Sequence, residues 1–234
     1  MHRHHKTLLA EITKLRRKRT HSQANDSYLS SGHRYYDVSV PARRALAKAW
    51  LKDNKAIADA EFIALLDVLI RGKSHEEKTV ACILLSYHPA GRKQVEPAQL
   101  DVWLDHLVGW AEIDSLGANV FKAEELLSDW PTWSAFIKNL ARDKNSNKRR
   151  AALVFLTGPV RYSADKRLAN LAFDTIATLK TERNVVITKA TSWLLRSMVQ
   201  NHRRAVEAYL RKNRPTLPAI AVRETMRKIE TGRK

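Results

Sequence analysis

Apolar side chains recur at helical spacing along most of the chain. Phe62, Leu65, Leu66 and Leu69 follow the i, i+3, i+4, i+7 pattern of a helix with one buried face. No stretch alternates apolar and polar residues as a half-buried strand would, and the chain has only 7 glycines and 7 prolines. The pattern therefore predicts an all-α protein.

Prolines and glycines mark the expected helix boundaries. Pro41, Pro97 and Pro131 each stand where a proline suits the first turn of a helix, because its missing N–H is unsatisfied there in any case. Glycine is common at the position that follows a helix, and three glycines stand where a helix is expected to end: Gly72, Gly91 and Gly158.

The expected helices repeat in pairs. The first helix of each pair begins near residues 41, 75, 112, 147, 184 and 217, a spacing of about 33 to 37 residues. A steady period in this range is typical of an α-solenoid, in which two-helix repeats stack because no repeat can bury its apolar face alone. Such an array curves, and we expect its concave face to carry the basic helices. A compact helical bundle is the alternative.

The chain is strongly basic. Among its 234 residues, a formal net charge of +18 and a pI near 10.2 favour a polyanionic partner, and nucleic acid is the commonest such partner. Acidic residues concentrate between positions 58 and 132, whereas basic ones concentrate in residues 16–19, 144–150 and 203–214. This segregation favours a phosphate-binding face over the alternative of an evenly solvated surface.

Several functional classes are disfavoured by the sequence. The single cysteine, Cys82, allows no intrachain disulfide and stands among apolar residues, so we expect it to be buried. No apolar run is long enough to span a membrane, and the basic N-terminal run has the wrong order for a signal peptide, so we expect a cytoplasmic protein.

No metal or cofactor is expected. The histidines of residues 1–5 resemble a metal-binding tract, but we expect this tract to be disordered or to contact phosphates. The remaining histidines lack metal-ligand spacing, and there is no Cys-x-x-Cys pair, glycine-rich phosphate loop or Ser-His-Asp arrangement.

Trp110 and Asp114 form the most informative pair. Four residues apart, an indole and a carboxylate lie side by side on one face of a helix, which suits a cation or a positive charge that develops during a reaction. Two structural alternatives compete with this interpretation. Trp110 can be core filler, and Asp114, like the nearby Glu112, can be an acid favoured by the positive end of a helix dipole.

Short sequence strings in order along the chain resemble the AlkD-type DNA alkylation repair glycosylases, which are built from HEAT-like repeats. The resemblance begins at Tyr28 and covers nearly the whole chain. The strings are Val40-Pro41-Ala-Arg-Arg44, Trp110-Ala-Glu-Ile-Asp114-Ser, Arg150-Ala-Ala-Leu-Val-Phe, Lys189-Ala-Thr-Ser-Trp193-Leu-Leu-Arg196 and Leu217-Pro-Ala-Ile-Ala-Val-Arg223-Glu.

The resemblance implies a right-handed, curved α-solenoid of two-helix HEAT-like repeats with a basic concave face. We expect a single domain over residues 1–234, whose first twenty or so residues are basic and form a loosely packed helix. The implied enzyme is a monomer without a cofactor. It excises positively charged N3- and N7-alkylated purines from duplex DNA, without turning the base into a deep pocket, and leaves an abasic site.

The chemistry of such a reaction accounts for the residue types. A cationic base leaves without a general acid, and the sugar becomes an oxocarbenium-like cation that one carboxylate can stabilise. Asp114 is the candidate carboxylate, with Trp110 and Trp193 packed on the sugar and backbone. Phosphate contacts are expected from Arg150. The other candidates for DNA binding are Lys148, Arg149, Tyr28, Lys189 and Arg196.

Some residues depart from the family pattern or suit a purely structural role. Asp37 stands where relatives often have glycine, and Asn147 where tryptophan is common. Trp193 alone would be assigned to the core and Arg150 alone to a solvated surface. We expect the remaining tryptophans to be structural: Trp50, Trp103, Trp130 and Trp133.

Two other functions remain open. Some relatives that lack the tryptophan and aspartate set recognise DNA structure without cleaving it, and a helical-repeat chain can also serve as a scaffold for acidic proteins. Trp110, Asp114 and Trp193 together favour the enzyme over the first alternative, and the basic helices argue against the second.

Overall fold

Helices make up the regular structure of the described residues, apart from one isolated β-bridge between Arg34 and Ser74. The computed structural model describes residues 2–16, 29, 31–118 and 120–233. The all-α prediction is confirmed. Tyr28 and the basic residues 17–19 lie outside the described residues.

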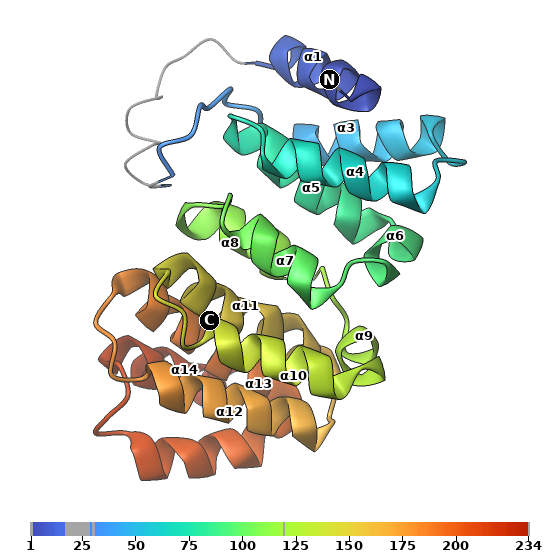
Figure 1. Ribbon diagram of the computed structural model, residues 1–234. Coiled ribbons are helices and arrows are strands. Elements are labelled where there is room, and N and C mark those ends of the chain that lie inside the picture. The colour runs from blue at the N-terminus through green and yellow to red at the C-terminus, as the bar shows by residue number, and fades with distance from the viewer. Residues whose placement is uncertain (1, 17–28, 30, 119, 234) are drawn as a thin grey trace. The chain divides into compact units, whose positions relative to one another are not determined.

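The chain divides into two compact units, residues 1–116 and 117–234. In the first unit α5 is the central helix, and α3 and α4 both pack against it (Figure 1). Helix α1 contacts α4 and α5. The helices that begin in this unit are α1 (Arg3–Lys14), α3 (Val40–Asp53), α4 (Asp59–Ile70), α5 (His75–Tyr87), α6 (Pro89–Lys93), α7 (Pro97–Leu104) and α8 (Gly109–Gly117).

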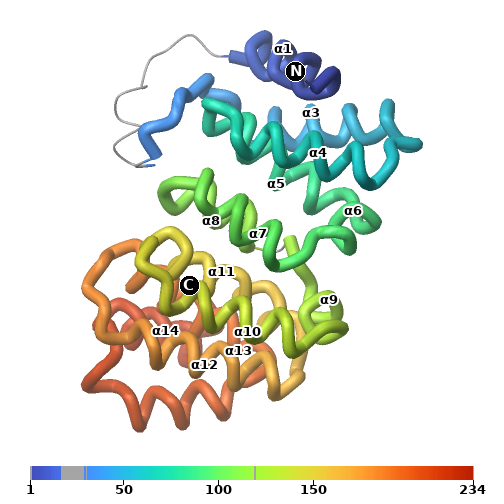
Figure 2. The backbone as a smooth tube through the Cα atoms, viewed as in Figure 1, coloured from blue at the N-terminus to red at the C-terminus, as the bar shows by residue number. Residues whose placement is uncertain are grey.

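The second unit is built on a pair of adjacent helices, α11 and α13. Helix α12 packs against both, α14 packs against α13, and α10 lies beside α11 and α12 (Figure 2). The helices of this unit are α9 (Ala123–Ser128), α10 (Trp130–Leu140), α11 (Ser146–Tyr162), α12 (Lys166–Leu179), α13 (Val185–Asn213) and α14 (Ala219–Thr231).

The predicted repeat of helix pairs is confirmed. Helices α3, α5, α8, α11, α13 and α14 begin at residues 40, 75, 109, 146, 185 and 219, each close to a predicted start. Helix α13 itself contains a pair, because His202 has the non-helical angles φ −128° and ψ 27° and divides it into two segments. The fold is the all-α solenoid that the period predicts, and its curvature and handedness stay predictions.

Side chains bond across neighbouring repeats at the same sequence distance as the helices. In the first unit, Trp103 Nε1 donates to Asp67 Oδ1 over 3.2 Å, a separation of 36 residues. In the second, Arg161 Nη2 donates to Ser197 Oγ over 3.3 Å, again 36 residues apart. Because contacts recur at one repeat length, each repeat is held by its neighbours, as in a solenoid.

The boundary predictions from proline are confirmed, and two of those from glycine are wrong. Pro41, Pro97 and Pro131 stand in the first turns of α3, α7 and α10. Gly91, however, lies inside α6, where a Cβ would overlap the Phe62 ring. Gly158 lies inside α11, which continues to residue 162 because its whole stretch from 151 to 160 is buried. Apolar burial there outweighs the poor helix propensity of glycine and proline.

Helix α1 is anchored by its histidines. The His4 ring meets Trp50 edge-on at 5.2 Å between centroids, and His5 Nε2 lies 2.7 Å from Glu77 Oε1. His5 is buried, and so are Leu8 and Ile12 on the same face. The expectation that the histidine tract of residues 1–5 is disordered is therefore wrong for residues 3–5, which belong to α1, and its contact with phosphates stays a prediction.

The structural assignments of Cys82 and of most remaining tryptophans are also confirmed. Cys82 is buried, and burial raises the pKa of its thiol, which makes it inert. Trp50, Trp103 and Trp133 are buried in the core. Trp130 is half-buried, with the Arg167 guanidinium 5.7 Å from its ring centroid.

Replacing Asp37 by glycine should stabilise the protein. Asp37 has φ 57°, in the left-handed region where a Cβ is unfavourable, which accounts for the glycine expected there in relatives. We expect Asp37→Gly to raise the free energy of unfolding by about 0.5 to 1 kcal/mol, since the relief of strain exceeds the added entropy of the unfolded chain. Urea unfolding monitored by circular dichroism measures it, with Ala64→Gly, at an exposed position in the middle of α4, as a destabilising control. An unchanged or lower value for Asp37→Gly would contradict the strain.

Candidate functional site

Helix α8 presents the tryptophan and aspartate of the candidate site. Trp110 and Asp114 lie four residues apart on it, and both side chains are partly exposed. The helix begins at Gly109, whose φ of 76° is a conformation that other residues rarely adopt. Trp110 keeps part of its surface accessible, as contact with a ligand requires, and its assignment to the site over the core-filler alternative stays a prediction.

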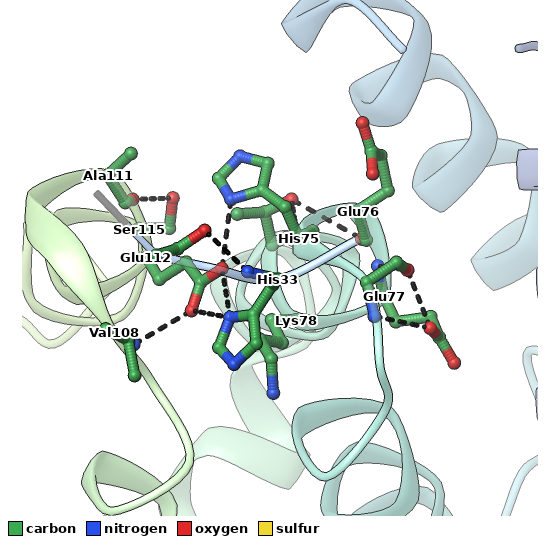
Figure 3. A network of polar contacts seen from close by, with 12 residues as sticks. His33, His75, Glu76, Glu77, Lys78, Val108, Ala111, Glu112 and Ser115 are labelled. Atoms are coloured by element: carbon green, nitrogen blue, oxygen red, sulfur yellow. Dashed lines mark hydrogen bonds and ion pairs between the residues drawn. The ribbon is translucent and has the colours of Figure 1, made fainter. Parts of the chain in front are cut away.

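Between these two residues stands a buried glutamate. Glu112 has no exposed surface, and its carboxylate lies between two histidine rings (Figure 3). The Val108 N–H donates to Glu112 Oε2 over 2.9 Å, His33 Nδ1 lies 3.0 Å from Oε1, and His75 Nδ1 lies 3.1 Å from Oε1. The carboxylate thus satisfies a backbone donor at the start of α8 and binds two side chains from earlier in the chain.

The surroundings of Glu112 keep it ionised. Burial alone raises the pKa of the Glu112 carboxyl, but the hydrogen bonds from His33, His75 and the Val108 N–H outweigh burial and lower this pKa below its usual value. The sequence indicates only that Glu112 is an acid near the start of a helix. The repeat length of the helix pairs could have indicated its partner, because His75 precedes Glu112 by 37 residues, or one repeat.

In the second unit, one stripe of α13 gathers three of the predicted residues. Lys189, Trp193 and Arg196 follow at helical spacing, with Lys189 exposed and the other two half-buried. Arg196 Nε lies 3.3 Å from both Ser192 Oγ and Glu224 Oε2. Burial lowers the pKa of the Arg196 guanidinium, and the neighbouring Glu224 opposes that shift.

Arg150 reaches the same part of α13. It is only 5% exposed, and its Nη1 donates to the carbonyl of Val186 near the start of that helix. Val186 is three residues before Lys189 and seven before Trp193, so the structure brings the Arg150 guanidinium beside this stripe. The alternative of a solvated surface charge is wrong for Arg150.

Of the two residues before Arg150, Arg149 is hydrogen-bonded within the second unit and Lys148 is buried. Arg149 donates from Nε to Glu182 Oε1 over 2.5 Å and from Nη2 to Glu182 Oε2 over 3.2 Å. Its Nη1 also donates to the carbonyls of Asp143 and Lys144, each over 2.8 Å. Lys148 is 5% exposed. Arg149 is therefore a weaker candidate for a phosphate contact than the sequence indicates.

The predicted site residues belong to two units. Trp110 and Asp114 lie in the first unit, whereas Arg150, Lys189 and Trp193 lie in the second. Their convergence on one surface stays a prediction. Asn147, where relatives often have tryptophan, lies in the first turn of α11, and its N–H donates to the side chain of the N-cap residue Asn145 over 2.9 Å.

Neither a metal-binding group nor a membrane-spanning helix is found among the described residues. No group of three or more histidine, cysteine, aspartate or glutamate side chains there could hold a metal ion. None of the helices described is both long and apolar enough to cross a membrane.

The stability that Glu112 contributes should depend on pH. Because its folded pKa is lowered, the contribution is complete above the unfolded value of 4.5 and is lost as the pH falls through the folded pKa. We expect Glu112→Gln to lower the free energy of unfolding at pH 7 by about 2 to 3 kcal/mol, and this deficit to shrink below pH 4.5. Urea titrations across this range measure it, beside the exposed control Glu96→Gln. A deficit that stays constant in acid would contradict the ionised state.

Comparison with known proteins identifies the family. The family model described as DNA alkylation repair enzyme matches residues 9–229. A solved structure of a predicted DNA alkylation repair enzyme from Enterococcus faecalis is similar to this chain with a TM-score of 0.73. It is 18% identical, and the match covers 94% of this chain and 99% of that one, which shows the shared fold. Among curated proteins, none matches. Since the family model spans nearly the whole chain, the chain belongs to the DNA alkylation repair enzyme family.

Proposed function

We propose that this protein is a monofunctional DNA glycosylase that hydrolyses the N-glycosidic bond of positively charged N3- and N7-alkylated purines in duplex DNA. The product is an abasic site. One observation carries the proposal: Trp110 and Asp114 share a partly exposed face of α8 in a chain of the DNA alkylation repair family. Membership of that family also supports DNA as the partner.

The proposed reaction needs one carboxylate. The bond between C1′ of the sugar and the base nitrogen breaks, and its electron pair moves to the base and neutralises the positive charge. The sugar is left as an oxocarbenium-like cation, which the Asp114 carboxylate stabilises. Water then adds to C1′ and loses a proton, for which Asp114 is the proposed acceptor.

Aromatic side chains suit the sugar that becomes positive. The faces of indole rings attract cationic and positively polarised groups, so Trp110 and Trp193 are proposed to pack against the damaged nucleotide. Both keep part of their surface exposed, as such a contact requires. Recognition through charge predicts that bulky cationic adducts are excised and uncharged lesions are poor substrates.

Binding to DNA is proposed to depend on the stripe of α13 and on net charge. Lys189 is exposed and Arg196 half-buried on the same stripe as Trp193, and Arg150 lies beside it. The formal charge of +18 supplies the attraction to phosphates at long range. Tyr28, Lys148 and Arg149 stay candidates for further contacts, Arg149 with its donors shared with Glu182.

Replacing Asp114 by asparagine should abolish most of the excision. Asparagine keeps the shape of the side chain but not the charge that stabilises the sugar cation, so we expect the single-turnover rate to fall by about 100-fold or more. The substrate is a duplex with one 7-methylguanine, and cleavage at the abasic product measures the rate. The matched control is Asp53→Asn, an exposed aspartate at the end of α3.

The outcome for the wild-type protein decides between enzyme and binding protein. A rate no greater than spontaneous depurination, with tight binding to the same duplex, would instead support a DNA-structure-binding protein. Equal rates for Asp114→Asn and the wild type would remove Asp114 from the mechanism.

Replacing Lys189 by alanine should weaken binding to any duplex. One lost phosphate contact lowers the slope of log K against log salt by about one, irrespective of sequence. Lys138→Ala is the matched control, because Lys138 is exposed on α10, which packs against α11 and α12. Fluorescence anisotropy over a range of salt concentrations measures both variants, and a slope for Lys189→Ala equal to that of the control would exclude the contact.

A further inference from the structure

A chain of buried polar side chains links three successive repeats of the first unit. Arg43 Nη1 donates to His75 Nε2 over 3.3 Å, and His75 Nδ1 lies 3.1 Å from Glu112 Oε1. The residues are separated by 32 and 37 positions, one repeat each. They are 7%, 3% and 0% exposed, so water does not compete for these bonds.

The direction of each hydrogen bond follows from the arginine. A guanidinium has donors and no acceptor, so His75 Nε2 must accept and cannot carry a proton. The ring proton therefore sits on Nδ1 and is donated to the Glu112 carboxylate. Arg43 Nη1 also donates to Thr79 Oγ1, whose hydroxyl donates to the His75 carbonyl over 2.8 Å. The arginine thus has two acceptors, and His75 has one tautomer.

A second arm reaches Glu112 from the segment before α3. His33 Nδ1 lies 3.0 Å from Glu112 Oε1 and 3.1 Å from Oε2. The residues after His33 are held by another buried acid, since Tyr36 N and Val38 N donate to the Glu76 carboxylate over 3.0 and 3.3 Å. The start of α8 and the segment 33–38 are therefore joined through one carboxylate, as Figure 3 shows for His33, His75 and Glu112.

The position of Glu112 on α8 connects this anchor to the candidate site. Glu112 is two positions after Trp110 and two before Asp114, and each step of two positions is a rotation of about 200° around the helix. Its side chain therefore points away from the face that carries the other two. Fixing Glu112 and the Val108 N–H sets the rotation of the first turn of α8, and with it the direction of that face.

We propose that Glu112 is a positioning residue, held by the relay of Arg43 and His75 and by His33, that orients Trp110 and Asp114 for the reaction. The proposal rests on the proposed function. Small displacements of a group that must meet a developing charge cost large factors in rate, so a rotated α8 should bind DNA but excise slowly.

The first test measures the tautomer of His75 without DNA. Long-range proton–nitrogen correlation spectra of the full chain labelled with nitrogen-15, assigned with His75→Gln, distinguish a protonated from an unprotonated ring nitrogen. We expect Nδ1 to be protonated and Nε2 to be unprotonated. A His75 ring protonated at Nε2 would overturn the relay, whether or not the protein is an enzyme.

The second test separates positioning from stability. Glu112→Gln and the exposed control Glu96→Gln are compared with wild type at a temperature where circular dichroism shows all three folded. We expect the single-turnover excision rate of Glu112→Gln to fall by about tenfold or more, with Kd for undamaged duplex within about twofold of wild type. A lower melting temperature with a wild-type rate would show a structural role alone and overturn the proposal.

A milder variant covers the case in which Glu112→Gln does not fold. The His33 side chain is 23% exposed, so His33→Asn should fold, and we expect a smaller loss of rate in the same direction. A wild-type rate for His33→Asn in that case overturns the proposal.

If the wild type excises nothing, the proposed function fails separately. The resonance of the Trp110 indole N–H then decides whether Glu112 orients α8. It should shift in His33→Asn and stay in place in Glu96→Gln, and an unshifted resonance in His33→Asn overturns the positioning role.

Discussion

The first unit depends on carboxylates that are buried and must be satisfied. An ion removed from water costs several kcal/mol unless hydrogen bonds and opposite charges replace the water. Glu76, Glu77 and Glu112 are 0%, 4% and 0% exposed, and each accepts from partners outside its own turn. Those partners stand on neighbouring repeats or on segments that precede them. Directional hydrogen bonds therefore fix the stacking of the repeats, in addition to apolar contacts. The donors reach these carboxylates only when the repeats are stacked in one arrangement.

In the second unit, arginine side chains make corresponding bonds across repeats, from the buried Arg150 and the partly exposed Arg149. Arg149 pairs with Glu182 across 33 residues, and Arg150 donates to Val186 across 36. Ser192 donates to Glu224 over 2.6 Å across 32 residues. Much of the basic character of residues 144–150 therefore holds repeats together. What remains for a partner are exposed cations such as Lys189, which is why net charge alone does not locate an interface.

The sequence predicts the helices well because their cause is local and periodic. Apolar spacing and first-turn prolines place α3, α7 and α10, and the period places the start of each repeat. It also predicts that Trp110 and Asp114 share a face. The sequence does not predict the burial of Glu112 or the pairing of Arg149 with Glu182, because the identity of a charged residue does not indicate its partner. It also fails at Gly158, where packing overrides propensity.

Two acidic residues in one turn of α8 differ in burial, and this difference determines what each can do. Glu112 and Asp114 stand two residues apart on α8, yet one is fully buried and the other partly exposed. A buried carboxylate with its donors in place cannot meet a substrate, but it can hold a helix in one rotation. An accessible carboxylate can meet a cation, but only if its helix is held. In our proposal, the pair of Trp110 and Asp114 therefore requires a second acid behind it, Glu112, which side chains of other repeats keep ionised.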